Sequence, residues 1–336
     1  MSTPSVSVLL PVRDGADHLA TCIDSLVRQT DDDFEVVVVD DGSRDATPRL
    51  LEDWATTDPR VRVFTQDRLG LVAALERARY AARGRWLARM DADDIALPAR
   101  LARQRELAEH DPTLVLGGCG IRYIPRSGLG RGALRYERWL NALVEPADLV
   151  RDLFVECPLA HPTFFMRAEA VANVGGYRDH GWPEDYDLLL RLWRAGGRLG
   201  TVPEVLLEWR DRPNRLSRTH RSYDADAFRR CKAHHLTRSL LKGRDGVVVW
   251  GAGPVGKAFS RRLTAEGVKV RAFVDLNPRK LGQEIHGAPV IPPPQVTSYR
   301  GAFCVVAVGQ FGARARIRAW LIQLGWKEGK NFVAVA

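Results

Sequence analysis

Continuous apolar runs that stop at acidic residues constrain the fold of this chain more than any other sequence feature. Residues 34–39 read FEVVVV, and the run ends in 40–43, DDGS. A run that is apolar at nearly every position is typical of a strand covered on both faces, as in a parallel sheet. Residues 86–90, WLARM, form a similar run that ends in 91–94, DADD. Because Asp is a poor strand former, both acidic groups are expected where a strand stops and a loop begins.

Helical patterns alternate with these runs along the first hundred residues. Strands are expected at 6–10, 34–39, 61–65 and 86–90, and helices at 16–29, 47–54 and 71–82. This alternation predicts right-handed βαβ units and an open sheet with helices on both faces. Ligands of such sheets bind beyond the carboxyl ends of the strands, where both acidic turns are expected. The two turns are therefore expected to face one cleft.

Length, charge and cysteine content narrow the class of protein. A chain of 336 residues is long enough for two domains. The net charge of +9 is compatible with phosphate-bearing substrates, nucleic acid or an anionic membrane surface. The five cysteines never have C-x-x-C spacing, which argues against a structural zinc or a disulfide framework and fits a reducing cytoplasm. No run approaches the roughly 18 apolar residues of a membrane span, so we expect a cytoplasmic protein, at most peripheral to a membrane.

The acidic cluster 91–94 has two interpretations. Asp91 and Asp93, spaced i and i+2, can bind a hard divalent cation, Mg²⁺ or Mn²⁺, together with substrate phosphate oxygens. A solvated acidic turn is the alternative, and it would be preferred for an isolated D-x-D-D. The second strand that ends in carboxylates, Asp40-Asp41, favours the metal site.

Several ordered motifs together resemble the family 2 glycosyltransferases of the GT-A fold. They are PVRDG, VVVVDDGSRD, GLVAALERARYAARGRW, RMDADD and WPEDYDLLLRLWRAG, within roughly residues 5–218. The resemblance implies transfer of a sugar from a nucleoside diphosphate sugar, with UDP the expected nucleotide. The implied acceptor is a hydroxyl of a glycan or lipid-linked molecule in polysaccharide or glycoconjugate synthesis, and the anomeric carbon is inverted.

The resemblance also implies roles for individual residues. The donor-binding positions are Pro11, Arg13, Asp41, Asp91 and Arg212, of which Pro11 and Asp41 match contacts to the base. Asp91 and Asp93 match the metal and diphosphate motif, with Asp93 the direct ligand. The family often has His where Arg212 stands. Because an arginine cannot ligate a metal but can pair with phosphate, we expect a diphosphate contact there.

The pair Glu184-Asp185 matches the acidic pair that supplies the catalytic base, and Asp185 is preferred over Glu184. These residues also follow Pro183 at a predicted helix start, where negative charge is stabilising, and the two roles are compatible. On the acceptor side the resemblance points to His161 and Trp182. A packed structural histidine is an equal alternative for His161. Trp182 either stacks on a sugar ring, which we prefer, or fills core.

Glycosyl transfer calls for these groups on chemical grounds as well. A cation that bridges the phosphates stabilises the departing nucleoside diphosphate without a proton. A positioned carboxylate can remove the proton of the incoming hydroxyl. Asp91 and Asp93 suit the first task, and Asp185 suits the second.

Two stretches depart from the family pattern or from regular structure. Relatives usually carry Asn where this chain has Glu76, so the local hydrogen bonds at that position stay open. Residues 125–137 are rich in Gly and Arg and predict a flexible loop near the acceptor side.

The segment 210–244 is strongly basic. It holds 11 Lys and Arg against three Asp, with helical character over 226–241. A solvated helical linker is one interpretation, and a surface for anionic acceptors or membrane lipid phosphates is the other. Because no recognised nucleic-acid module accompanies the segment, nucleic acid is not an expected partner.

A second nucleotide-binding pattern follows this segment. Gly251, Gly253 and Gly256 lie between a strand at 247–250 and a helix, and the next strand ends in Asp275. This is G-x-G-x-x-G in its required strand–turn–helix context, with Asp275 where a ribose hydroxyl would be bound. Residues 273–290 resemble small Rossmann-like domains of polysaccharide-biosynthesis proteins. We therefore expect a nucleotide ligand here rather than catalysis, with a purely structural domain as the alternative.

The sequence thus predicts an α/β protein with a GT-A domain at 1–209, a basic helical linker at 210–244 and a Rossmann-like domain at 245–336. A nucleotide-sugar sensor and an NAD-dependent oxidoreductase acting through the C-terminal glycines are the alternatives. An oxidoreductase does not explain the acidic clusters. The presence of both Asp93 and Asp185 argues against a non-catalytic sensor.

Overall fold

The chain divides into two compact units, each built on its own β-sheet. The structure is a computed structural model that describes residues 3–299 and 301–336. Unit 1 contains the described residues up to Leu149, together with Pro158–His180 and Glu184–Arg218. Unit 2 contains Val150–Cys157, Gly181–Pro183 and the described residues of Thr219–Ala336.

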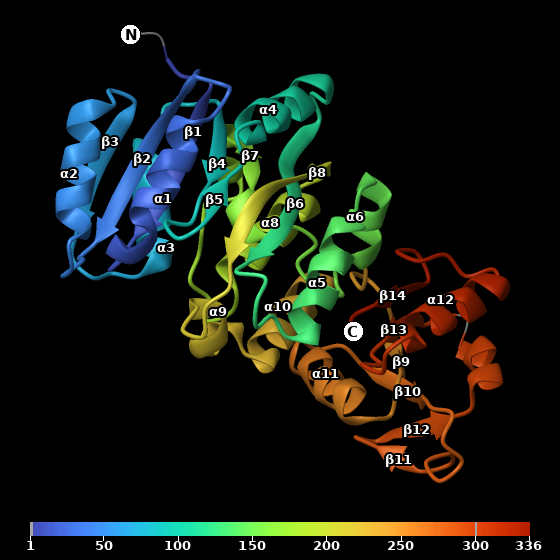
Figure 1. The fold of residues 1–336 in the computed structure, drawn as a ribbon. Coiled ribbons are helices and arrows are strands. Elements are labelled where there is room, and N and C mark those ends of the chain that lie inside the picture. Colours follow the sequence, from blue (N-terminus) through green and yellow to red (C-terminus); the bar gives the residue numbers. More distant parts are fainter. Residues whose placement is uncertain (1–2, 300) are drawn as a thin grey trace. The chain divides into compact units, whose positions relative to one another are not determined.

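Unit 1 is organised around an eight-stranded sheet in the order β3-β2-β1-β4-β7-β6-β8-β5 (Figure 1). The strands are β1 (Val6–Val12), β2 (Phe34–Asp41), β3 (Val61–Gln66), β4 (Trp86–Arg89), β5 (Ile95–Ala96), β6 (Leu114–Ile124), β7 (Phe165–Arg167) and β8 (Arg198–Arg210). The first four strands are parallel to one another, whereas β7 is antiparallel to both β4 and β6. At the far side β8 runs parallel to β6 and antiparallel to β5. The sheet is therefore mixed.

Helices connect the strands of unit 1 as the alternating pattern predicted. They are α1 (Ala16–Val27), α2 (Thr47–Thr57), α3 (Leu71–Ala81), α4 (Arg100–His110), α5 (Arg131–Asn141), α7 (Ala168–Asn173) and α8 (Glu184–Arg194), with a short 3-10 turn η1 (His161–Thr163). Two further helices, α6 (Pro146–Asp152) and α9 (Leu216–Thr219), cross the boundaries between the units. The predicted strands and helices of the first hundred residues are confirmed in type and order.

The core explains why the early strands are apolar throughout. β1 and β2 are buried at every position, because both of their faces lie inside the protein. α1 contributes a stripe of Leu19, Cys22 and Leu26 to the same core, at helical spacing. Continuous apolar strands of this kind are the ones that a sheet needs when helices cover it on both sides.

Parallel pairing of β2, β1 and β4 brings the two acidic turns to one edge of the sheet. Val12 lies opposite Asp40 on β2, and Leu9 lies opposite Arg89 on β4. The ladder ends one step later, where the Met90 N–H donates to the Leu9 carbonyl at 3.1 Å. The turns that follow β2 and β4 therefore leave the sheet at the same edge, as predicted.

One expectation for unit 1 is wrong. The Gly- and Arg-rich stretch 125–137 is not loop throughout, because α5 begins at Arg131. Its side chains at 133, 136, 139 and 140 pack on the core, and the Tyr136 ring lies 5.6 Å from that of Trp139. These contacts stabilise a helix whose composition of Gly and Arg gave little indication of one.

Unit 2 has the strand order of a Rossmann-like half. Its six strands follow the order β11-β12-β10-β9-β13-β14. They are β9 (Val247–Trp250), β10 (Val270–Val274), β11 (Glu284–Ile285), β12 (Ala288–Ile291), β13 (Phe303–Val306) and β14 (Phe332–Ala334). All pairs from β12 to β14 are parallel, and β11 is an antiparallel edge strand. In chain order the parallel strands read 3-2-1-4-5, so the predicted Rossmann-like fold is confirmed.

The other described elements of unit 2 are helices and 3-10 turns. They are η2 (Arg221–Tyr223), α10 (Ala225–Thr237), α11 (Pro254–Ala265), η3 (Pro293–Tyr299) and α12 (Ala313–Gln323). The Asp224 side chain caps α10 by accepting hydrogen bonds from the backbone N–H groups of Asp226 and Ala227. Within residues 3–299 and 301–336, no helix is long and apolar enough to cross a membrane.

Candidate active site

Three carboxylates gather where the chain leaves β4. Asp91, Asp93 and Asp94 each offer one oxygen, and these oxygens lie within 4.8 Å of one another. A tight turn holds them together, since the Asp94 N–H donates to the Asp91 carbonyl at 3.2 Å. Asp91 and Asp93 are half-buried and Asp94 is buried. The structure therefore brings together the two residues singled out in the sequence and adds a third.

Asp94 is the most constrained of the three. Its Oδ1 accepts a hydrogen bond from the Arg210 backbone N–H at 2.8 Å, whereas its buried Oδ2 has no hydrogen-bond partner among the described residues. Burial and then the charges of Asp91 and Asp93 raise the pKa of Asp94 well above its usual range. Burial and the charge of Asp91 raise the pKa of Asp93 as well. A set of crowded carboxylate oxygens with one oxygen unsatisfied fits a hard divalent cation.

Arginines reach this cluster from two elements. Arg89 of β4 is 2% exposed, and its Nη1 lies 2.5 Å from Asp91 Oδ1. After β8, Arg212 Nη2 lies 2.7 Å from Asp93 Oδ2, and Arg210 Nε donates to the Asp93 carbonyl at 2.8 Å. Arg212 thus lies beside the acidic cluster. Its contact with a diphosphate stays a prediction.

Asp41, at the end of β2, fixes a turn. Its carboxylate accepts hydrogen bonds from Gln66 Nε2 at 2.8 Å and from the backbone N–H groups of Leu69 and Gly70 at 2.8 and 2.9 Å. Arg13 Nη1 lies 3.5 Å from the second carboxylate oxygen. The buried Asp41 therefore anchors the loop that leads into α3, and Pro11 is buried nearby in β1. The proposed contacts of Pro11, Arg13 and Asp41 with a nucleotide base stay predictions.

The acidic pair begins α8. Glu184 is buried and Asp185 is half-buried, and both lie in the first helical turn, where the helix dipole favours negative charge. His161 Nδ1 lies 3.7 Å from Glu184 Oε1, and His161 Nε2 is hydrogen-bonded to the Tyr177 hydroxyl at 3.0 Å. Burial and then the charge of Arg89 lower the pKa of His161 well below its usual range, so the imidazole is neutral. Both ring nitrogens of His161 are directed at protein groups.

Trp182 packs against α10 of unit 2. Its ring centroid lies 5.1 Å from that of His234, and the residue is half-buried. Whether the rest of its surface receives a sugar stays a prediction.

Sequence reasoning gave no role to Arg89 and little weight to Asp94. A signal for Arg89 is visible in the printed sequence, because a charge interrupts the apolar run WLARM directly before the acidic residues. A buried charge in a strand is costly unless it is paired. The sequence alone did not distinguish Asp94 from the other carboxylates of the acidic turn. Its burial depends on the end of β8, which is 116 residues away in the sequence.

The basic segment carries less free positive charge than its composition indicates. Arg212 is paired with Asp93, Arg218 lies 2.5 Å from Asp211, and Arg238 lies 2.5 Å from Glu266. Contact of this segment with an anionic membrane or acceptor stays a prediction.

The three glycines of unit 2 occupy different environments. Gly251 has φ +123°, and a Cβ there would lie 2.6 Å from the Ala307 carbonyl oxygen. A Cβ at Gly256 would lie 1.8 Å from the Gly251 carbonyl oxygen, so the helix packs directly on the turn. Around Gly253, by contrast, no described atom outside its chain neighbours comes within 4 Å of that position. Gly251 and Gly256 are required by the fold, and Gly253 faces open space.

Asp275 closes this turn from the neighbouring strand. Its Oδ2 accepts a hydrogen bond from the Ala252 N–H at 3.1 Å and lies 2.9 Å from Lys280 Nζ. Although burial opposes it, hydrogen bonding from Lys280 and from the Asn277 N–H leaves the pKa of Asp275 below its usual value. Next to it Leu276 is 77% exposed, and Phe311, which follows β13, is 81% exposed. The same sheet edge therefore carries a glycine turn, a paired carboxylate and two exposed apolar side chains.

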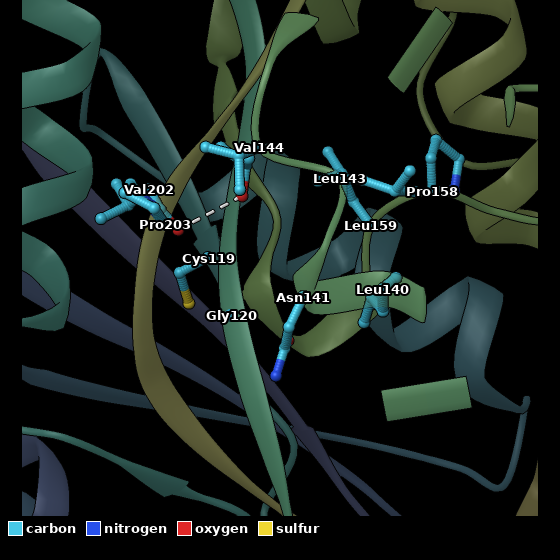
Figure 2. Close-up of a pocket in the computed structure, with 11 residues that line it drawn as sticks. Cys119, Gly120, Leu140, Asn141, Leu143, Val144, Pro158, Leu159, Val202 and Pro203 are labelled. Carbon is cyan, nitrogen blue, oxygen red and sulfur yellow. Dashed lines mark hydrogen bonds between the residues drawn. The ribbon is translucent and has the colours of Figure 1, made fainter. Parts of the chain in front are cut away.

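Unit 1 also has a small pocket with a different set of lining residues. Figure 2 shows it between β6, β8, the end of α5 and residues 158–159. Its amide side chain, Asn141, is already bound, because it accepts from the Ile121 N–H at 2.9 Å and donates to the Ile121 carbonyl at 2.8 Å. No predicted site residue lines this pocket, and we assign no function to it.

Comparison with known proteins identifies the family. The family model described as "Glycosyl transferase family 2" matches residues 7–175. The chain belongs to this family, which makes it a glycosyltransferase.

Individual relatives agree with this assignment. The chain is 30% identical over 207 residues to the amylovoran biosynthesis glycosyltransferase AmsE of Erwinia amylovora. This match covers 61% of this chain and 75% of AmsE. It is 29% identical over 245 residues to the O-antigen biosynthesis glycosyltransferase WbnJ of Escherichia coli. This match covers 71% of this chain and 90% of WbnJ.

The fold is that of GT-A transferases. It resembles the crystal structure of S. aureus TarS 1-349 in complex with UDP-GlcNAc, with a TM-score of 0.53. The match covers 69% of this chain and 66% of that one, at 17% identity, so the likeness concerns the fold.

The raised pKa of Asp94 predicts a pH-dependent effect on stability. In metal-free protein the unfolded state releases this proton at a lower pH than the folded state, so stability falls as the pH rises from the usual Asp pKa through the folded value. Asp94→Asn keeps an acceptor for the Arg210 N–H and removes the charge. We therefore expect the variant to be more stable than wild type at pH 7 in chelator, with the difference vanishing below the usual Asp range, near pH 3 to 4.

Urea unfolding at several pH values measures this difference. Asp58→Asn is the matched control of opposite sign, since the hydrogen bond from Arg60 lowers the pKa of Asp58. That variant should lose stability at pH 7. A destabilised Asp94→Asn at pH 7 would show that the arginines around the cluster outweigh its burial.

Proposed function

We propose that this glycosyltransferase is metal-dependent and inverting, and that it moves a sugar from a UDP-linked donor to a hydroxyl of a growing polysaccharide or glycoconjugate. The observation that carries the proposal is the cluster of Asp91, Asp93 and Asp94 at the edge where β1, β2 and β4 end. Ligands of open α/β sheets bind at this edge. The names of the relatives, which concern amylovoran and O-antigen biosynthesis, support a glycan acceptor.

Asp93 and Asp91 are the residues that would hold Mn²⁺ or Mg²⁺. Their oxygens are hard ligands, and the unsatisfied Oδ2 of the adjacent Asp94 indicates that the cluster lacks compensating charge. A divalent cation bound there would supply positive charge to the departing nucleoside diphosphate. Arg212, 2.7 Å from Asp93, is the proposed partner of the same phosphates.

Asp185 is the proposed general base. It is more accessible than the buried Glu184, and a base must reach the proton of the acceptor hydroxyl. In a single displacement the acceptor oxygen forms its bond to the anomeric carbon as the bond to the diphosphate breaks, and Asp185 takes the hydroxyl proton. Attack from the face opposite the leaving group inverts the anomeric carbon and leaves no sugar on the protein. For the acceptor side, Trp182 is the proposed residue. Both ring nitrogens of His161 are directed at protein groups, which favours the packed alternative for that residue.

Unit 2 supports a second proposal, a nucleotide or nucleotide-sugar site without catalysis. The supporting observation is the contrast among the glycines, because the fold requires Gly251 and Gly256 but leaves open space at Gly253. In dinucleotide-binding folds the second glycine allows a pyrophosphate to approach the backbone. The exposed Leu276 and Phe311 at the same sheet edge supply apolar surface for a base.

Removing the metal ligand tests the first proposal. Asp93→Ala should abolish release of UDP from UDP-sugars and the dependence of donor binding on Mn²⁺, while the thermal unfolding transition is kept. Chelation of the wild type should have the same effect. Asp67→Ala, an exposed carboxylate beyond β3, is the control and should keep wild-type activity. Full turnover in chelator, or in Asp93→Ala, would contradict metal dependence.

Removing the base separates chemistry from binding. Asp185→Asn should lower turnover by about 10²–10⁴-fold, the usual contribution of a general base, with donor and Mn²⁺ affinity little changed. Steady-state kinetics and calorimetry measure the two quantities. If Asp185→Asn keeps its turnover and Glu184→Gln loses it, Glu184 is the base instead.

The nucleotide site of unit 2 is tested in the full chain. Gly253→Trp should fill the open space and remove one equivalent of bound nucleotide, measured by calorimetry with UDP, UDP-sugars, ADP and NAD(H), while release of UDP from donors is unchanged. Ser298→Trp, at an exposed position of η3, is the control. Identical nucleotide stoichiometry in wild type and Gly253→Trp would leave unit 2 a structural domain.

A further inference from the structure

A row of polar groups in unit 1 connects α3 to the first turn of α8. It begins at Glu76 of α3. Glu76 Oε1 accepts hydrogen bonds from the Tyr177 backbone N–H at 2.7 Å and from Arg79 Nε at 2.8 Å. The second oxygen accepts from Arg79 Nη2 at 2.8 Å. Glu76 is thus held in place by an ion pair on its own helix and fastens the chain at Tyr177.

The glycine before Tyr177 allows this close approach. Gly176 has φ +64°, and a Cβ there would lie 2.4 Å from Glu76 Oε1. The carboxylate therefore occupies space that any other residue would fill. The turn before Tyr177 is fixed by a group 101 residues away in the sequence.

Tyr177 carries the connection to His161. Its side chain is 3% exposed, its hydroxyl lies 3.0 Å from His161 Nε2, and the two rings are 5.5 Å apart. A neutral imidazole carries one N–H. With the Glu184 carboxylate 3.7 Å from Nδ1, the proton is favoured on Nδ1, which leaves Nε2 to accept from the Tyr177 hydroxyl.

We propose that Glu76, Tyr177 and His161 are positioning residues, which orient Glu184 and through it the acidic pair that starts α8. This inference rests on the proposed function, which assigns the base to that pair. His161 Nδ1 and Glu184 Oε1 are separated by slightly more than a hydrogen bond, and catalytic contacts of this kind often tighten only when substrate is bound. None of the three residues is assigned a contact with donor or acceptor in this role.

Simple packing does not account for the arrangement. His161 and Tyr177 are 8% and 3% exposed, and buried polar groups cost free energy unless they are hydrogen-bonded. Apolar side chains of similar size would fill the same space. The row has a direction, because each member's polar atom is directed at the next, and its last member is Glu184. An acceptor contact for His161 would need a free ring nitrogen, and both are directed at protein groups.

Tyr177→Phe tests the proposal with the smallest change. The variant keeps the buried ring and removes only the hydroxyl, so His161 Nε2 loses its donor and the imidazole loses the hydrogen bond that holds its orientation. We expect kcat for UDP release from a UDP-sugar with Mn²⁺ to fall by about 10- to 100-fold, as for other misplaced catalytic groups. KM for the donor and the Mn²⁺ concentration for half-activation should stay within twofold, because neither site is touched.

Glu76 provides an independent test by conservative rescue. Glu76→Ala should lower kcat in the same way, whereas Glu76→Gln keeps an acceptor for the Tyr177 N–H and should retain most of the activity. Because both variants act on one row, Glu76→Ala combined with Tyr177→Phe should lose less than the product of the single effects. Glu35→Gln is the control. Glu35 is a buried carboxylate of β2 that accepts from Ser7 Oγ and the Arg83 N–H, and its loss should lower stability without changing kcat.

The outcomes distinguish failure of the positioning role from failure of the base assignment on which it rests. A folded Tyr177→Phe with wild-type kcat, in a protein that Glu184→Gln or Asp185→Asn inactivates, would overturn the positioning role and leave the base assignment intact. Retained turnover in both Glu184→Gln and Asp185→Asn would overturn the base assignment itself. If Tyr177→Phe does not fold, equal kcat in Glu76→Ala and wild type overturns the positioning role.

Discussion

Repulsion among three carboxylates in one buried turn is the constraint on which the rest of unit 1 depends. At a separation near 4 Å, two like charges repel by about 4 kcal/mol at the effective dielectric typical of protein sites. Asp91, Asp93 and Asp94 can therefore share a turn only if other parts of the chain supply positive charge and N–H donors. β4 supplies Arg89, and the end of β8 supplies the Arg210 N–H and the Arg212 side chain. The ends of β4 and β8 are joined by electrostatics as well as by the sheet.

The two arginines offset part of the negative charge of the cluster, and they do so from different depths. Arg89 is buried, and Arg100 of α4, also buried, donates to the Arg89 carbonyl at 2.6 Å. Arg89 is therefore part of the fixed interior and stays at Asp91. The Arg212 side chain, by contrast, is 37% exposed and follows the last residue of a strand. Moving it away from Asp93 breaks an ion pair but no sheet ladder, so Asp93 is the carboxylate of the cluster that can exchange its partner most easily. This difference supports Asp93 as the direct metal ligand in the proposed function.

Those features of the fold that depend on the local amino-acid pattern could be predicted from the sequence. Apolar runs with acidic ends predicted the parallel strands and their shared edge, because a strand covered on both faces leaves a continuous signature. The glycine spacing predicted the turn of unit 2, because a strand–turn–helix connection of this kind depends on glycines close together in the sequence. What could not be predicted depends on distant contacts, such as the burial of Asp94 under Arg210 and the hydrogen bond from the Tyr177 N–H to Glu76. α5 was missed because its packing on Trp209 comes from a strand some 70 residues later, while its own Gly and Arg indicate a loop.

In unit 2, the edge of the sheet where the parallel strands end carries groups that suit a different ligand. Asp275 comes directly after β10, much as Asp91 comes soon after β4. Lys280 and two backbone N–H groups donate hydrogen bonds to its carboxylate. Among the described residues, Asp275 is not part of a cluster like that of Asp91, Asp93 and Asp94. At this edge Gly253 faces open space, and Leu276 and Phe311 are largely exposed. Such a combination suits a phosphate held by amides and a base held by apolar contact. Of the two sheet edges, the carboxylate cluster of unit 1 is therefore the one for which we propose a metal, and the proposed ligand of unit 2 is a nucleotide.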